Sequence, residues 1–188
     1  LSTMAALLHV DHLGEPLVGA FIDRSGVPAT EWIRRYLRTY LHPIAYLLYR
    51  YELKFSPHGE NLILRVREQQ VVGAFYKDIG EEMAVVGRRP LPEDMERVRA
   101  VVPGEEKALS IFTDVFDGVL RHLAGILDAD GILPVDRFWR RVSSVLDEYE
   151  ADRAIASVAT VANEDLPVII ADIRQTAETF RTVATEVG

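Results

Sequence analysis

Two short apolar runs joined by a polar turn read Leu62-Ile-Leu-Arg-Val-Arg-Glu-Gln-Gln-Val-Val-Gly-Ala-Phe-Tyr76. Apolar and polar side chains alternate toward the end of the first run, which is typical of a strand with one buried face. The polar residues between the two runs are few enough for a tight turn. This stretch therefore predicts a β-hairpin with strands over residues 62–67 and 71–76.

Apolar residues at helical spacing lie on both sides of the hairpin. Before it they run from Trp32 to Leu41, and we expect Pro43 to end this helix and to open a second one. After residue 103, the same spacing predicts helices over 108–123, 136–149 and 166–183. Helices beside an antiparallel hairpin make the predicted fold class α+β.

The composition is that of a globular protein with its own core. Of the 188 residues, 48% are hydrophobic and 27% are charged. No apolar run approaches the roughly 20 residues that a membrane-spanning helix needs, so we expect no membrane partner and a cytoplasmic location. The chain begins at Leu1 rather than at a methionine, and we interpret it as a fragment of a longer protein.

Charge and cysteine content argue against several classes of function. The formal net charge of -8 disfavours binding to a phosphate backbone, so no nucleic-acid partner is expected. The chain contains no cysteine, which removes disulfides, thiolate nucleophiles, cysteine-rich zinc sites and thiolate-ligated iron–sulfur clusters. Chemistry in this chain must rest on its other polar side chains.

Polar residues flank the predicted hairpin at its open end. Asn61 comes directly before the first strand, and Asp78 follows the second. Antiparallel strands set such ends side by side, about 5 Å apart. His58 lies three residues before Asn61, in a bend between Pro57 and Gly59. We therefore expect an imidazole, a carboxamide and a carboxylate to meet at one end of the hairpin.

These groups suit a nucleotide with its Mg²⁺ ion. Asn61 and Asp78 offer the oxygen ligands that Mg²⁺ prefers, and Glu81 is a further candidate ligand one turn later. Lys77 is placed to reach a phosphate, and His58 is a donor to phosphate oxygens. The alternative, from the residues alone, is that these polar side chains merely bound a hairpin.

Other polar residues carry simpler interpretations. Arg34, Arg35 and Arg38 lie off the apolar stripe of their helix and are interpreted as a solvated face. His42 and His122 lie on apolar helices and are interpreted as structural residues.

Three stretches resemble a known family. They read His58-Gly-Glu-Asn-Leu-Ile-Leu64, Tyr76-Lys-Asp-Ile-Gly-Glu-Glu82 and Leu109-Ser-Ile-Phe-Thr-Asp-Val-Phe116. They are similar to the C-terminal part of the NRPS-independent siderophore synthetases, the aerobactin-synthetase-like family, and most of all to its desferrioxamine-synthetase branch. The resemblance covers roughly residues 7–150 and fades after Asp152.

The resemblance implies an ATP- and Mg²⁺-dependent ligase of siderophore biosynthesis and iron acquisition. Such an enzyme adenylates a carboxylate, releases pyrophosphate and passes the acyl group to an amine or hydroxyl, as in hydroxamate siderophore assembly. His58 and Asn61 match positions that contact the nucleotide, with His58 as the catalytic candidate and Lys77 as a further nucleotide contact. Asp78 matches a metal position, shared with Asn61, and Glu81 aligns only approximately.

The family also implies an architecture and partners. Residues 1–104 are expected to form a palm-like α+β part, and residues 105–188 a helical, thumb-like part. Expected partners are a small-molecule carboxylate, an amine or hydroxamate, and the N-terminal half of the same synthetase; a homodimer stays open. The fragment alone is expected to be inactive.

Two alternatives to a synthetase stay open. One is a kinase-like phosphotransferase, although the catalytic Asp of that pattern is missing because Gly59-Glu60 stands in its place. The other is a non-catalytic remnant or dimerisation module.

Overall fold

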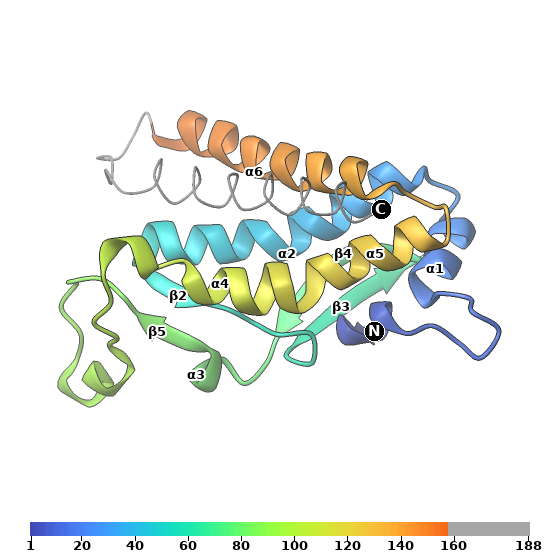
Figure 1. The fold of residues 1–188 in the computed structure, drawn as a ribbon. Coiled ribbons are helices and arrows are strands. Elements are labelled where there is room, and N and C mark those ends of the chain that lie inside the picture. Colours follow the sequence, from blue (N-terminus) through green and yellow to red (C-terminus); the bar gives the residue numbers. More distant parts are fainter. Residues whose placement is uncertain (158–188) are drawn as a thin grey trace.

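The computed structural model describes residues 1–157 and confirms the predicted hairpin (Figure 1). Strands β3 (Leu62–Arg67) and β4 (Gln70–Tyr76) pair antiparallel, and β1 (Ser2–Thr3) pairs with the other edge of β3. Glu68 and Gln69 form the turn with φ values of 51° and 58°. Two left-handed central residues make a type I′ turn, whose twist matches that of the strands it joins.

Helix α2 (Ala29–Tyr51) covers the inner face of this sheet (Figure 1). Its aromatic stripe is buried, with ring centroids 6.2 Å apart between Trp32 and Tyr36 and 6.0 Å between Tyr36 and Tyr40. Side chains at this spacing lie on one face of a helix. The stripe therefore forms the layer between the sheet and the C-terminal helices.

The prediction that Pro43 ends a helix is wrong, because α2 runs straight through it. The same face stays buried on both sides of the proline, with Leu41 3% exposed and Ile44 2% exposed. A proline in a helix costs about 3 kcal/mol, whereas burying each large apolar side chain contributes about 1.5–3 kcal/mol. The carbonyl oxygen of Thr39, which loses its helical donor at Pro43, accepts the Tyr76 hydroxyl instead (3.2 Å).

The C-terminal part is helical, as predicted, but one segment is wound differently. A short α4 (Leu109–Ile111) leads into the π-helix η4 (Phe112–Leu120) and then into α5 (Arg121–Ala129). The single α-helix predicted over 108–123 is wrong in this respect. Apolar residues four positions apart share a face in either kind of helix, so their spacing did not separate the two.

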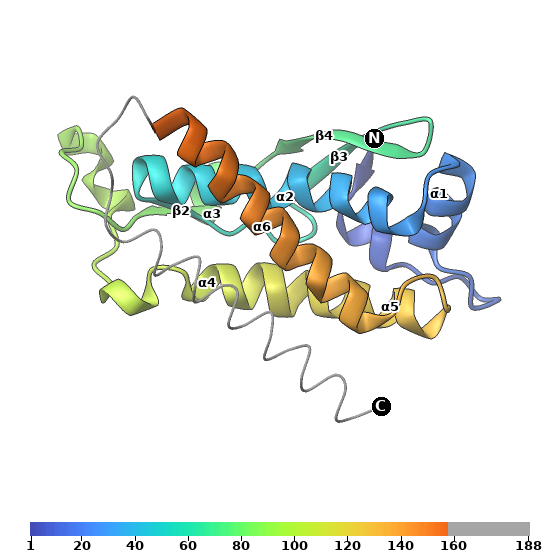
Figure 2. The ribbon, with the colours of Figure 1, turned by 90° about the horizontal axis from the view of Figure 1, so that it is seen from above.

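The last described helix, α6 (Val135–Ser157), packs along α2 (Figure 2). It includes the predicted helix over 136–149. The helix predicted at 166–183 lies outside the described residues.

The remaining elements are short and lie around the two layers. A second antiparallel pair joins β2 (Leu53–Phe55) to β5 (Met83–Val85). The others are η1 (Ala5–Leu8), α1 (Leu17–Ser25), α3 (Ile79–Glu82), η2 (Glu93–Val98) and η3 (Gly104–Glu106). Small antiparallel sheets with flanking helices confirm the α+β class. Along residues 1–157, no helix combines the length and the apolar character needed to cross a lipid bilayer.

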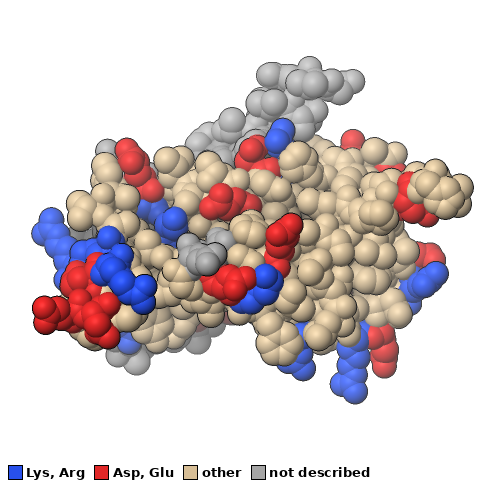
Figure 3. Space-filling model, turned by 90° about the horizontal axis from the view of Figure 1, so that it is seen from below, with Lys and Arg blue, Asp and Glu red and all other residues tan. Residues whose placement is uncertain are grey.

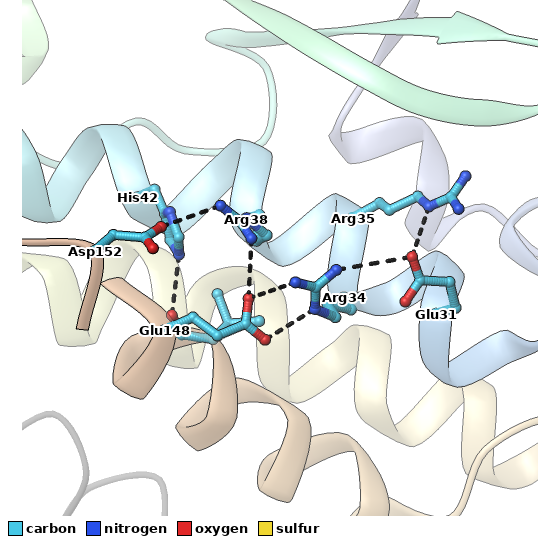
Figure 4. Close-up of polar contacts among 8 residues, drawn as sticks. Glu31, Arg34, Arg35, Arg38, His42, Glu148 and Asp152 are labelled. Atoms are coloured by element: carbon cyan, nitrogen blue, oxygen red, sulfur yellow. Dashed lines mark hydrogen bonds and ion pairs between the residues drawn. The ribbon is translucent and has the colours of Figure 1, made fainter. Parts of the chain in front are cut away.

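Arg35 is 40% exposed and pairs with Glu31 on its own helix, in line with the predicted solvated face. Arg34 and Arg38 are 30% and 39% exposed and are paired across helices. They belong to an ion-pair network that joins α2 to α6 (Figure 4). Arg34 and Arg38 both contact Glu148, and Arg38 also contacts Asp152. The Arg34 side chain is 30% exposed and that of Glu148 is 26% exposed, so the network is partly buried. Its acidic members on α6, Glu148 and Asp152, lie more than a hundred positions away from these arginines in the sequence.

Candidate functional site

The open end of the hairpin brings the predicted site residues to one place. Beyond the last strand pair, Leu62 with Tyr76, the backbone N–H of Lys77 donates to the carbonyl oxygen of Asn61 at 3.0 Å. Asn61 and Lys77 are therefore opposite each other, and Asp78 is the next residue. We call His58, Asn61, Lys77 and Asp78 the hairpin mouth.

The loop that carries His58 is fixed by backbone contacts. The N–H of Asn61 donates to the carbonyl oxygen of His58 at 3.0 Å, which closes a turn, and the N–H of Ala5 donates to the carbonyl oxygen of Gly59 at 2.9 Å. A Cβ atom on Gly59 would lie 3.1 Å from Cα and Cβ of Ala5. Glycine thus allows a close approach of η1 to the loop, and a larger residue would need η1 or the loop to shift.

Asn61 and His58 contact each other through their side chains. Nδ2 of Asn61 donates to Nε2 of His58 at 3.3 Å. Asn61 is 5% exposed, whereas His58 is exposed. A buried carboxamide needs hydrogen-bond partners, and the imidazole supplies one of them, while the backbone N–H of Glu60 donates to Nδ1 of the same ring at 3.4 Å. The pair presents one oriented amide and one accessible imidazole at the mouth.

Asp78 and Lys77 form the other side of the mouth. Asp78 has φ 53° and ψ 34°, a left-handed conformation that aspartate tolerates better than most residues. The chain turns there from β4 into α3. Nζ of Lys77 lies 2.7 Å from Oδ2 of Asp78, and both side chains are about half exposed. A carboxylate and an ammonium group are therefore accessible at the same edge.

The donor set suits a Mg²⁺ ion that is shared with phosphate oxygens. Within the described residues, no three His, Cys, Asp or Glu side chains are grouped so that they would enclose a metal ion. Proteins commonly bind Mg²⁺ through one or two carboxylates, with substrate phosphates and water completing the octahedron. Asp78 and Asn61 fit that pattern. The side chain of Glu81, a predicted ligand, lies outside the described part of the chain.

Two tyrosine hydroxyls hold the mouth, and sequence reasoning missed both. The hydroxyl of Tyr40 donates to the carbonyl oxygen of Pro57 at 2.9 Å, and that of Tyr76 donates to Thr39. Burial raises the pKa of Tyr76, so its hydroxyl remains a donor at neutral pH. The apolar spacing continues past Pro43 and could have indicated that the helix does not end there. An unbroken helix leaves the carbonyl oxygen of Thr39 without its backbone donor, so another donor is needed.

The outer face of the sheet, opposite α2, exposes apolar side chains. Phe75 is 53% exposed and Val72 is 54% exposed, and the guanidinium of Arg65 lies 5.5 Å from the Phe75 ring centroid. Arg65 and Arg67 are exposed there, in line with a solvated strand. Figure 3, which views the molecule from below, shows large areas of uncharged residues between the charged groups. We call Val72, Phe75 and Ile79 the apolar edge.

His42 and His122 lie away from the mouth. Nε2 of His42, which is labelled in Figure 4, lies 3.0 Å from the carbonyl oxygen of Val145. The His42 ring packs edge-on against Tyr149. Burial lowers the pKa of His42, so the neutral form donates this hydrogen bond. His122 is exposed on α5, 3.5 Å from the Arg121 guanidinium. His42 is structural, as predicted from the sequence.

Comparisons with known proteins match most of the chain. A model of the family described as "Ferric iron reductase FhuF-like transporter" matches residues 30–166. Putrebactin synthase of Shewanella sp. (strain MR-4) is 44% identical over 152 residues, which are 80% of this chain and 24% of that protein. The curated relatives are thus about four times as long as the stretch that they share with this chain.

Two solved structures extend the likeness to the fold. Aerobactin synthetase IucC from a hypervirulent pathotype of Klebsiella pneumoniae matches with a TM-score of 0.76 and 28% identity, over 83% of this chain and 30% of that one. ATP-bound aerobactin synthetase IucA from the same source matches with a TM-score of 0.64 and 20% identity, over 80% of this chain and 29% of that one. The second match concerns the fold alone.

Proposed function

The chain belongs to the FhuF-like family and is homologous to the siderophore synthetases, and from this we propose that it holds the nucleotide in an ATP-dependent siderophore synthetase. The reaction proposed is adenylation of a carboxylate followed by transfer of the acyl group to an amine or hydroxyl, as in hydroxamate siderophores. A cytoplasmic location follows from the need for ATP.

One observation carries this proposal. The hydrogen bond from Lys77 to Asn61 sets a carboxamide, an imidazole, an ammonium group and a carboxylate around one accessible end of a hairpin. Oxygen ligands for Mg²⁺ and cationic or N–H donors for phosphate oxygens suit a metal-bound triphosphate. That a relative of the same fold has been solved with ATP bound supports the choice of nucleotide.

The roles assigned to the residues follow from their chemistry. Asp78 and Asn61 hold Mg²⁺, which supplies positive charge to the triphosphate. Lys77 exchanges its contact with Asp78 for a phosphate oxygen. His58, as the catalytic candidate, donates to the phosphate nearest the reacting carboxylate, where negative charge must be offset before two anions approach. Glu81 stays a predicted further ligand.

We further propose that the segment acts within a longer synthetase, with residues 1–104 as its palm-like part and the rest as its thumb-like part. The apolar edge supports this, because Val72, Phe75 and Ile79 are each about half exposed.

If the N-terminal half covers this edge, Phe75→Asp will lower the Tm of the full-length protein by several degrees but hardly change that of the 188-residue chain. Leu13→Asp, at a loop residue that is 74% exposed, is the control. Equal effects of Phe75→Asp in both proteins would refute the covering.

The nucleotide product tests the reaction. The full-length protein that carries this segment is expected to form AMP and pyrophosphate from ATP in the presence of citrate or an acylated diamine hydroxamate. Asp78→Ala is expected to abolish this turnover. Formation of ADP would instead favour a kinase-like phosphotransferase, the second candidate, which uses an Asn and an Asp on a hairpin in a similar way.

A non-catalytic role is the remaining candidate. Calorimetry that detects no ATP binding to the full-length protein would favour a docking or dimerisation module. The family's description suggests a reductase role, but this chain contains no cysteine and so offers no thiolate ligand for an iron–sulfur cluster.

A further inference from the structure

We propose that Tyr40 and Tyr76 are positioning residues that fix the two sides of the hairpin mouth relative to each other, with the turn of α2 around Pro43 as their common anchor. The inference rests on the proposed function only for its consequence in nucleotide binding. Its structural part concerns the hydrogen bonds of the two tyrosine hydroxyls, which hydrogen exchange tests without nucleotide.

The Asp78 side is anchored through the proline. Pro43 has no N–H, so the carbonyl oxygen of Thr39 lacks the donor that an α-helix supplies from four residues later. The hydroxyl of Tyr76 lies 3.2 Å from this oxygen and 3.4 Å from the carbonyl oxygen of Tyr40. Tyr76 is the residue directly before Lys77. The donor that α2 lost at Pro43 is thus replaced by the strand that leads into the mouth.

The His58 side is anchored one residue further along the same helix. Tyr40 is fully buried, and its hydroxyl donates to the carbonyl oxygen of Pro57 at 2.9 Å. Pro57 directly precedes His58. The ring of Phe55, at the start of this loop, packs edge-on against the ring of Tyr76, with centroids 5.1 Å apart. Both sides of the mouth therefore meet at residues 39–43 of α2.

The two anchors and the mouth form a closed circuit of contacts. It passes from Tyr40 through the His58 loop to Asn61, across the 3.0 Å hydrogen bond to Lys77, and through Tyr76 back to α2. Neither side shifts without breaking a buried hydroxyl contact or the hydrogen bond between Asn61 and Lys77. Groups that must hold a metal-bound nucleotide need this kind of fixed spacing.

The chain offers a matched control in Tyr36. It lies on the same face of α2, one turn before Tyr40, and is equally buried, but its hydroxyl has no hydrogen-bond partner among the described residues. Tyr→Phe at position 36 therefore removes a buried hydroxyl without removing an anchor. It separates the loss of a hydroxyl from the loss of a contact.

Hydrogen exchange tests the structural part. In the 188-residue chain, Tyr40→Phe and Tyr76→Phe are each expected to speed exchange of the Lys77 amide roughly five- to tenfold, the factor that corresponds to one hydrogen bond. Tyr36→Phe is expected to leave it unchanged, and the Leu123 amide in α5 should not change in any variant. Unchanged exchange at Lys77, or equal acceleration at Leu123, would overturn the proposal.

A second-site variant tests the anchor itself. Pro43→Ala returns an N–H that donates to the carbonyl oxygen of Thr39, so Tyr76→Phe in that background is expected to speed Lys77 exchange less than twofold. The same acceleration in both backgrounds would mean that the Tyr76 hydroxyl does not replace the donor missing at Pro43, and this result would overturn the role of Pro43.

Nucleotide binding tests the positioning. In the full-length protein, Tyr40→Phe and Tyr76→Phe are expected to raise the KM for ATP about fivefold, whereas Tyr36→Phe is not. Faster exchange at Lys77 with an unchanged KM would overturn the positioning role. A wild-type protein that binds no ATP would overturn the proposed function. The exchange of the Lys77 amide would still test whether the two tyrosine hydroxyls fix the hairpin mouth.

Discussion

The guanidinium of Arg34 donates two hydrogen bonds of 2.8 Å to the two carboxylate oxygens of Glu148, one from Nε and one from Nη2. This bidentate pair joins α2, which carries the anchors of the hairpin mouth, to α6 in the C-terminal layer (Figure 4). Parallel hydrogen bonds between a guanidinium and a carboxylate fix geometry as well as adding energy. The pair therefore sets how the helical layer lies on α2.

A double-mutant cycle measures this pair. Arg34→Gln, Glu148→Gln and the double variant are expected to give a coupling free energy of about 0.5–1 kcal/mol from urea unfolding, reduced at 1 M salt. The Arg121–Asp117 pair on the surface of the helical layer, with both side chains about half exposed, is the control and should couple less. Equal coupling in the two cycles would mean that the α2–α6 pair has no special role.

His42 is expected to make stability depend on pH. Burial lowers its pKa below the ordinary value of 6.5, with Arg38 acting in the same direction and the Val145 carbonyl, Asp152 and Glu148 opposing it. As the pH falls below 6.5, the unfolded chain takes up a proton that the folded chain resists, so the unfolding free energy falls.

Thermal unfolding between pH 5 and pH 8 checks this. The wild type should lose stability on the acid side relative to His42→Gln, which keeps a donor for the Val145 carbonyl but does not titrate. His122→Gln, at an exposed position, should behave like the wild type. A stability difference between His42→Gln and the wild type that does not vary with pH would refute the prediction.

Gly59→Ala is expected to destabilise the protein by about 1–3 kcal/mol, the usual cost of overpacking. The new methyl group would lie 3.1 Å from backbone and side-chain atoms of Ala5, so the loop or η1 must move. Gly125→Ala in α5 meets nothing within 4 Å and should stabilise by about 0.5–1 kcal/mol, because alanine favours a helix. Denaturant unfolding of both variants tests this. An unchanged free energy of unfolding in Gly59→Ala would mean that the contact between residue 59 and Ala5 is not tight.

Local patterns predicted the elements well because the interactions that form them are local. Alternation placed the hairpin, although its turn lacks an Asn-Gly pair and uses Glu68 and Gln69 in left-handed conformations instead. Apolar spacing likewise placed the buried face of α2 and the helical character of the C-terminal part.

Contacts between distant residues were beyond such patterns. The donor that replaces the N–H missing at Pro43 comes from Tyr76, 37 positions from Thr39, and the partner of Arg34 lies 114 positions away. No periodicity within one element encodes either pairing. The open end of the hairpin was predictable because antiparallel pairing alone places Asn61 opposite Lys77, whereas its two tyrosine anchors depend on how α2 packs on the sheet.

Mg²⁺-dependent binding of ATP tests the central claim, that the hairpin mouth holds a metal-bound nucleotide. Calorimetry on the full-length protein should show ATP affinity that requires Mg²⁺ and falls at least tenfold in Asp78→Asn. Asp23→Asn, which removes the same charge from an exposed position on α1, should bind as the wild type does. Wild-type affinity in Asp78→Asn, or ATP binding that is indifferent to Mg²⁺, would contradict the account.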